Sequence, residues 1–257
     1  MQLKLNWIGM HVVDFESSLR FYTETLGMHA SDIKSDWAYI ESTGMTFELF
    51  GVSGTPTMNQ SLWGHGQPIR PSLQVADLHK TVAELRQRGV QFIGDIQQTS
   101  IGEFIEFIAP ENMRWILAHV TAYTFSATFN KPHIGWLELN ANRLTEQQAF
   151  YANILGMRAE NGNTEQVILR QGSNDPLLFL ESGGQRAAPF QIKENTLEPM
   201  PSHLISVETD NIEEAAAWIK SHNIPILTEI TRKTWGGIDF YIVDVDGYPI
   251  QIVKYAQ

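Results

Sequence analysis

The 257-residue sequence contains no cysteine, which excludes disulfide bonds, thiolate nucleophiles and thiolate metal sites. It also lacks any apolar run of the roughly 18 residues that a membrane-spanning helix needs. Positive charge is scarce: 18 Lys and Arg face 29 Asp and Glu, and a net charge of −11 repels nucleic-acid phosphates. No charged segment followed by an apolar stretch opens the chain. We therefore expect a cytoplasmic protein that binds neither nucleic acid nor membrane.

The sequence also lacks a Gly-rich phosphate-binding loop and a G-x-S-x-G elbow. It therefore does not indicate nucleotide phosphate binding or hydrolysis by a serine nucleophile. What it contains is an internal repeat. The segment FYTETLGM at 21–28 reappears as FYANILGM at 150–157, and the same offset places Trp7 on Trp136. Each half continues with a second strand–helix pattern and a closing hairpin. The sequence thus predicts an α+β fold of four tandem βαβββ units, two in residues 1–122 and two in residues 130–257.

The starts of the repeated helices carry capping signals. Asp14 or Ser17 is expected to cap the helix of the first copy. Thr145-Glu-Gln-Gln148 reads as a capping box for its counterpart. In the last hairpin, Asp246-Gly247 lies between alternating apolar residues, which is a strong signal for a tight turn.

Two sequence patterns resemble the modules of the glyoxalase / bleomycin-resistance / extradiol-dioxygenase (vicinal oxygen chelate) superfamily. They are D-x(6)-FY-x(3)-LG at 14–27 and D-x-D-G-x-P-I-x-I at 244–252. The resemblance covers nearly the whole chain. It implies paired half-open barrels of mixed sheet with flanking helices. Members include lyases, isomerases, ring-cleaving dioxygenases and non-catalytic drug-binding proteins, so the resemblance alone does not fix the function.

The resemblance also implies positions for a divalent metal such as Fe, Mn, Ni or Zn inside a barrel, held by His and Glu. In this sequence those positions hold mostly residues that cannot ligate: Trp7, Arg70 and Ile116 in the first half, and Trp136, Leu204, Gln251 and Phe179 in the second. Only Glu48 matches the optional middle-strand carboxylate, and His203 lies one residue from a ligand position. Indole and aliphatic groups cannot bind a metal, and Arg opposes a cation. We therefore expect no metal site of this type and no cofactor.

Strand alternation places Trp7 and His11 on one face of the first strand, and Trp136 and Glu138 on the matching face of its repeat. Flat aromatic walls can stack on planar or cationic ligands, although each Trp could instead fill its barrel. Arg70 could pair with Glu48 across the first barrel or receive a substrate carboxylate. The expected ligand-binding residues are Trp7, His11, Glu48, Arg70, Trp136, Glu138 and Gln251.

The leading functional prediction is metal-independent binding of a small aromatic or cationic molecule in a barrel. The alternative is a metal-dependent lyase, isomerase or extradiol-type dioxygenase, with Glu138 and His203 as candidate catalytic residues and His203, Glu138 and Gln251 as metal ligands. A third hypothesis is a structural or regulatory partner protein whose barrels are filled by its own side chains. The sequence leaves open the ligand, the barrel used, and whether the chain is a monomer or a homodimer.

Overall fold

Four βαβββ units build the protein. The computed structural model describes residues 3–41, 46–52, 69–121, 133–172, 177–183, 191–193, 196–198, 203–234 and 236–255. The first unit contains β1 (Leu3–Val12), α1 (Phe15–Arg20) with the π-helical turn η1 (Phe21–Thr25), β2 (His29–Ser31), β3 (Trp37–Glu41) and β4 (Thr46–Gly51). The second contains β5 (Ile69–Gln74), α2 (Leu78–Gln87), β6 (Gln91–Gln98), β7 (Gly102–Ala109), the 3₁₀ turn η3 (Pro110–Asn112) and β8 (Met113–Val120).

The second half of the chain repeats this order. The third unit contains β9 (His133–Ala141), α3 (Leu144–Leu155), β10 (Arg158–Gly162), β11 (Gln166–Arg170) and β12 (Leu177–Ser182). A small hairpin of β13 (Gln191–Lys193) and β14 (Thr196–Glu198) follows. The fourth unit contains β15 (His203–Thr209), α4 (Ile212–Ser221), β16 (Thr231–Arg232), β17 (Ile238–Val243) and β18 (Pro249–Lys254). The predicted α+β fold of four such units is confirmed. None of the described helices is both long and apolar enough to cross a membrane.

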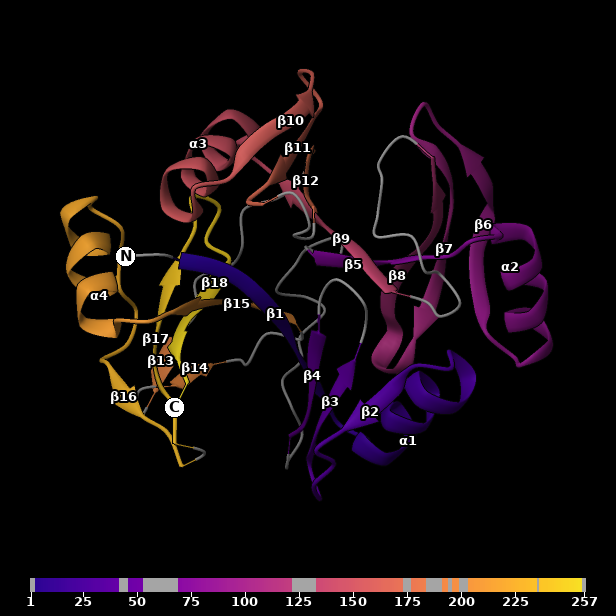
Figure 1. Cartoon of the computed structure of the whole chain (residues 1–257), viewed down its shortest axis with the longest axis horizontal. Coiled ribbons are helices and arrows are strands. Elements are labelled where there is room, and N and C mark those ends of the chain that lie inside the picture. The colour runs from indigo at the N-terminus through magenta and orange to yellow at the C-terminus, as the bar shows by residue number, and fades with distance from the viewer. Residues whose placement is uncertain are drawn as a thin grey trace.

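The units form two eight-stranded mixed sheets, and each sheet takes one unit from each half of the chain (Figure 1). Sheet A has the order β16-β17-β18-β15-β1-β4-β3-β2, from the first and fourth units. Sheet B has the order β10-β11-β12-β9-β5-β8-β7-β6, from the second and third. Neither strand order closes into a barrel. The division at 1–122 and 130–257 thus describes the sequence repeat, whereas the sheets join units across it.

This pairing corrects the expected ion pair between Glu48 and Arg70. Glu48 lies on β4 of sheet A and Arg70 on β5 of sheet B, so the two residues belong to different sheets. All four units have similar edge strands, and the sequence repeat does not indicate which units pair through these strands.

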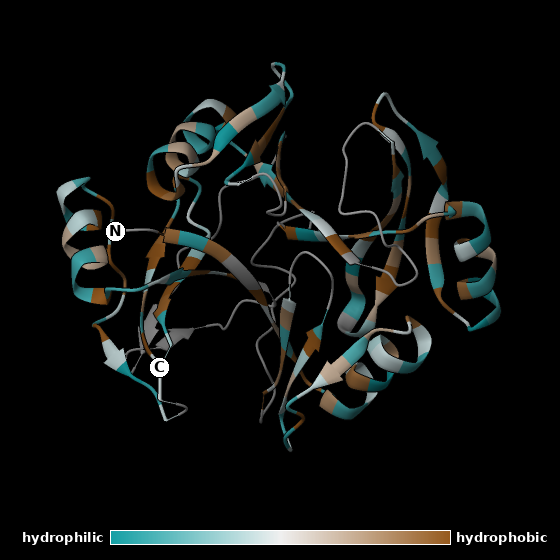
Figure 2. Ribbon diagram, in the orientation of Figure 1, coloured by the Kyte–Doolittle hydropathy of each residue, from teal (hydrophilic) through white to brown (hydrophobic). Residues whose placement is uncertain are grey.

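Helices cover one face of each sheet. The helices lie at the periphery (Figure 1), and hydrophilic and apolar bands alternate along the strands (Figure 2). Contacts link α1 to β4 and α4 to β18 in sheet A, and α2 to β8 and α3 to β11 and β12 in sheet B. A large core joins these faces; in it the Tyr22 ring lies 4.9 Å from that of Phe47 and 5.6 Å from that of Trp115. We call the opposite sides the helix-free faces.

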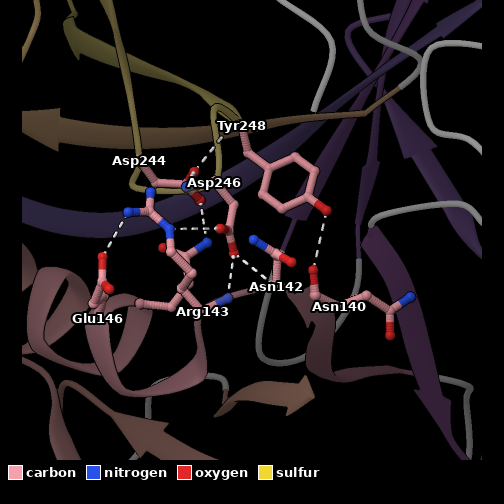
Figure 3. A network of polar contacts seen from close by, with 8 residues as sticks. Asn140, Asn142, Arg143, Glu146, Asp244, Asp246 and Tyr248 are labelled. Atoms are coloured by element: carbon pink, nitrogen blue, oxygen red, sulfur yellow. Dashed lines mark hydrogen bonds and ion pairs between the residues drawn. The ribbon is translucent and has the colours of Figure 1, made fainter. Parts of the chain in front are cut away.

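The turn between β17 and β18 docks the fourth unit onto the third (Figure 3). The expected capping box at Thr145–Gln148 is wrong: α3 begins at Leu144, and its N-cap, Arg143, makes no side-chain capping bond. Instead the Asp246 carboxylate accepts hydrogen bonds from the backbone N–H groups of Asn142 (2.8 Å) and Arg143 (3.4 Å). In α1 the expected cap holds, since Asp14 accepts from the Ser17 N–H at 2.9 Å. A carboxylate distant in sequence thus neutralises the N-terminal end of α3.

Candidate functional site

The structure divides the expected ligand-binding residues between the two sheets. Trp7 and His11 on β1, Glu48 on β4 and Gln251 on β18 belong to sheet A, as does His203 on β15. Arg70 on β5 and Trp136 and Glu138 on β9 belong to sheet B. The side chains of Trp7 and His203 lie outside the described residues.

On the helix-free face of sheet B, Arg70 stands among three carboxylates from three other strands. Its Nη1 donates to Glu106 Oε1 at 2.6 Å, and its Nη2 donates to Glu181 Oε2 at 3.2 Å and to Glu138 Oε1. Arg70 and Glu138 are direct cross-strand partners. Their side chains are only 18% and 11% exposed, so solvent screens the pair weakly. We call these four residues the ionic cluster.

The ionic cluster corrects the idea that Arg70 receives a substrate carboxylate, because three protein carboxylates already surround its guanidinium group. Nearby, Arg114 lies 3.7 Å from Glu106 but is 51% exposed. Even with Arg114 counted, three carboxylates face two guanidinium groups. Glu106 on β7 and Glu181 on β12 were missed from the sequence, since only the strand order brings them to Arg70.

An aromatic cluster lies beside these charges on the same face. The rings of Trp136 and Phe179 lie 5.1 Å apart at 32°, and Phe179 is the cross-strand neighbour of Glu138. Both rings belong to an apolar cluster, separate from the main core, that also contains Ile116, Ala118, Ile168 and Leu177. Trp136 is 4% exposed. Phe179 is 2% exposed, so the two rings form a buried apolar cluster beside the ionic cluster.

The helix-free face of sheet A is polar. Gln251 donates from Nε2 to Asp239 Oδ2 at 2.6 Å, and its Oε1 accepts from the Ser206 hydroxyl at 3.3 Å. Lys233 Nζ lies 3.1 Å from the other Asp239 oxygen. Gln251, Ser206 and Asp239 are all buried. These side chains and Lys233 thus form one polar network on this face. His11, also buried, stacks on Phe50 with 5.3 Å between ring centroids.

Glu48 is a second buried carboxyl group of sheet A and lies on β4, beside Gly9 on β1 and Tyr39 on β3. Burial raises its pKa to about 7, although hydrogen bonds from Tyr39 and Trp37 lower it in part. Burial and the nearby Glu48 charge raise the pKa of the Tyr39 hydroxyl in turn. Glu48 thus changes charge near neutral pH.

Replacing Glu48 with glutamine is expected to stabilise the protein at alkaline pH. Because the folded-state pKa is raised, the contribution of Glu48 to stability is present below its unfolded pKa and is lost as the pH rises through about 7. Gln keeps an acceptor oxygen for Tyr39 and carries no charge. We expect Glu48→Gln to raise the free energy of unfolding by about 1–3 kcal/mol at pH 8, and by less than about 1 kcal/mol at pH 5.

Urea unfolding at the two pH values measures this difference. Glu41→Gln on the neighbouring strand β3 is the matched control, because the Glu41 side chain is 53% exposed and should give no such gain. A loss of stability for Glu48→Gln at pH 8 would show that the Glu48 carboxylate is favourably paired in the folded protein.

A divalent metal would need several His, Asp or Glu side chains in one place. Across the described ranges no group of three or more such residues is placed to hold a metal ion. Glu138 pairs with Arg70 in sheet B, whereas His203 and Gln251 lie on strands of sheet A, so these three residues do not form one ligand set. The amide of Gln251 is engaged by Asp239 and Ser206. The described residues do not fit a metal centre.

Comparison with known proteins agrees with this architecture. The family model of the Glyoxalase/Bleomycin resistance protein/Dioxygenase superfamily matches residues 4–115 and 133–252. Glyoxalase I from Zea mays superimposes with a TM-score of 0.71 at 15% identity, over 98% of this chain and 92% of that one. The "putative dioxygenase" of Bacillus subtilis subsp. subtilis str. 168 gives a TM-score of 0.67 at 15% identity, over 100% of this chain and 87% of that one. No curated protein matches the sequence significantly. At such identities the superpositions establish a shared fold.

Proposed function

The chain belongs to the glyoxalase/bleomycin resistance protein/dioxygenase superfamily, and within it we propose a metal-independent protein that binds a small organic cation with an aromatic body. The proposed site is the helix-free face of sheet B. The observation that carries the proposal is the ionic cluster beside the rings of Trp136 and Phe179. All strands of sheet B come from one chain, which supports a monomer as the binding unit. A cytoplasmic location is also part of the proposal.

The charge balance of the ionic cluster favours a cationic ligand. Three carboxylates share one partly buried guanidinium group, so negative charge remains in excess. At about 4 Å, a further cation gains on the order of 4 kcal/mol of Coulomb energy at an effective dielectric constant of about 20. An anion would meet repulsion from the same three groups. The acidic chain as a whole adds to this preference.

The neighbouring rings favour an aromatic body on that cation. Phe179 is the cross-strand neighbour of Glu138, and Trp136 lies two residues before Glu138 on the same face of β9. Aromatic surfaces stabilise both planar rings and cations that approach their faces. A ligand that enters this face with its charge at Glu138 would therefore place its body against these two rings, which are 4% and 2% exposed without it.

Removal of the Glu138 charge tests this site. We expect benzylammonium to bind the wild-type protein and to bind Glu138→Gln about tenfold more weakly, because desolvation offsets most of the Coulomb gain and a net attraction of roughly 1.4 kcal/mol is lost. Isothermal titration calorimetry at low ionic strength measures both affinities. Raising the salt concentration should weaken the wild-type interaction further.

Glu103→Gln is the matched control. Glu103 lies on β7, the strand that carries Glu106, but its carboxylate lies 3.5 Å from His79 on α2 and so belongs to the helix side. This variant loses the same unit of charge and should bind like the wild type. Equal weakening in the two variants would show only a nonspecific charge effect, and the absence of wild-type binding to benzylammonium and related aromatic amines would count against the proposal.

The metal-dependent alternative has less support, because its three candidate ligands are divided between the sheets. Elemental analysis of protein purified without a metal-affinity tag tests it. A stoichiometric divalent metal that is lost in His203→Ala would favour a lyase, isomerase or dioxygenase over the binding protein proposed above.

A further inference from the structure

Two buried polar groups lie opposite each other on the helix-free face of sheet B. Ser72 on β5 is fully buried and Trp136 on β9 is 4% exposed, and the two are direct cross-strand partners. Neither the Ser72 hydroxyl nor the Trp136 indole N–H has a hydrogen-bond partner among the described residues. Buried polar groups in proteins are nearly always hydrogen-bonded. These two groups therefore lack the partner that buried polar groups normally have.

The strands on either side supply no such partner. The neighbour of Ser72 on β8 is Ile116, and the neighbour of Trp136 on β12 is Leu177. The four side chains thus form a row across the sheet with two polar groups in the middle and aliphatic groups at both ends. Indole N–H is a donor only, whereas a serine hydroxyl can donate or accept. An acceptor oxygen placed between the two groups would have to be within hydrogen-bond distance of both to satisfy them together.

The row lies next to the ionic cluster. Arg70 and Glu138 form the adjacent same-face pair on the same two strands, two residues from Ser72 and Trp136 respectively. Two residues of an extended strand span about 6.6 Å. A ligand whose cation lies at Glu138 therefore places its opposite end, at about this separation, beside the two donors.

Resting on the proposed function, we infer that the ligand carries an acceptor oxygen at the end remote from its charge, received by the Trp136 indole N–H and the Ser72 hydroxyl. The ligand class is an aromatic ammonium compound with an ether, carbonyl or phenol oxygen across the ring from the charged group. The ionic cluster binds the charge, the rings of Trp136 and Phe179 contact the aromatic body, and the two donors select the oxygen.

A pair of nearly isosteric probes separates this inference from the proposed function. In 4-methoxybenzylamine an ether oxygen takes the place of a methylene group of 4-ethylbenzylamine, and the charge and the ring are the same. We expect the wild-type protein to bind the methoxy compound about fivefold more tightly by calorimetry, as one net hydrogen bond implies. Trp136→Phe, which keeps an aromatic ring but lacks the N–H, should lose this preference, and Ser72→Ala should reduce it.

The Trp136 indole signal in a ¹H–¹⁵N spectrum, assigned by its absence in Trp136→Phe, should shift downfield with the methoxy compound and much less with the ethyl compound. Equal affinities of the two amines for the wild type, with both still weakened by Glu138→Gln, would overturn the inference and leave the proposed function standing, because the donors would then bind water alone. Failure of both amines to bind would overturn the proposed function and this inference with it.

Discussion

Asp244→Ala is expected to lower the free energy of unfolding by about 4 kcal/mol. Each buried donor that loses its acceptor costs about 1–3 kcal/mol, and partial relaxation of the structure around the turn offsets some of that total. Asp244 is buried in the turn after β17 and accepts four hydrogen bonds. One carboxylate oxygen receives Gln147 Nε2 at 2.7 Å and the Tyr151 hydroxyl at 3.1 Å. The other receives the backbone N–H groups of Asp246 at 3.0 Å and Tyr248 at 2.8 Å.

The loss should be large because Asp244 joins units three and four, next to the Asp246 contacts that Figure 3 shows. Gln147 and Tyr151 lie on α3, whereas the two backbone donors lie in the β17–β18 turn. Without the carboxylate, all four donors lose their acceptor in a buried interface. Urea unfolding at pH 6 measures the effect, and Asp210→Ala on the exposed turn before α4 is the control, for which we expect a change within about 0.5 kcal/mol. A similarly small change for Asp244→Ala would contradict this description of the interface.

The pH dependence of a second variant checks the same site. Burial raises the pKa of Asp244 to about 7 despite its donors. The contribution of the group to stability is therefore present below its unfolded pKa and is lost as the pH rises toward about 7. Asp244→Asn keeps an acceptor oxygen and cannot ionise, so relative to the wild type it should be less destabilised at pH 8 than at pH 5.

Arg70→Met is expected to lower the free energy of unfolding by about 3 kcal/mol at pH 7.5, because it leaves the carboxylates of the ionic cluster without their shared counter-ion. Met preserves the apolar stem and removes the charge. Glu106 and Glu138 have side chains only 19% and 11% exposed, so water solvates them poorly.

Chemical denaturation at pH 7.5 measures the effect. Arg20→Met is the control, because Arg20 is 59% exposed and lies 3.9 Å from Glu16, so its removal should cost less than about 0.5 kcal/mol. If Arg70→Met were as stable as Arg20→Met, the three carboxylates would not depend on Arg70. The charge argument for a cationic ligand would then lose its basis.

The sequence predicted the four units because local patterns define them. The repeated FYxxxLGM segment and the closing D-x-D-G turn depend on helix periodicity, a left-handed residue and a tight turn, which are local properties. The Asp14 cap is local in the same way. The cap of α3 is not: it comes from Asp246, about a hundred residues away along the chain, and no pattern near Leu144 could reveal it.

The candidate site was only partly predictable for the same reason. Trp136 and Arg70 were found because they stand at positions that the family resemblance marks, and Glu138 because strand alternation places it on the same face as Trp136. Their grouping on one sheet, and the contribution of Glu106 and Glu181, follow from strand order, which is a long-range property. The same strand order separates Glu48 and Gln251 from them and places both in the polar face of sheet A.

Calorimetric titration of 4-methoxybenzylamine into exhaustively chelated protein tests the central claim most directly. The proposed site is made of protein side chains alone, so one ligand should bind each chain, with an affinity unchanged by chelation and about tenfold weaker in Glu138→Gln. Binding that vanishes in chelator and returns on addition of a divalent metal would contradict the claim.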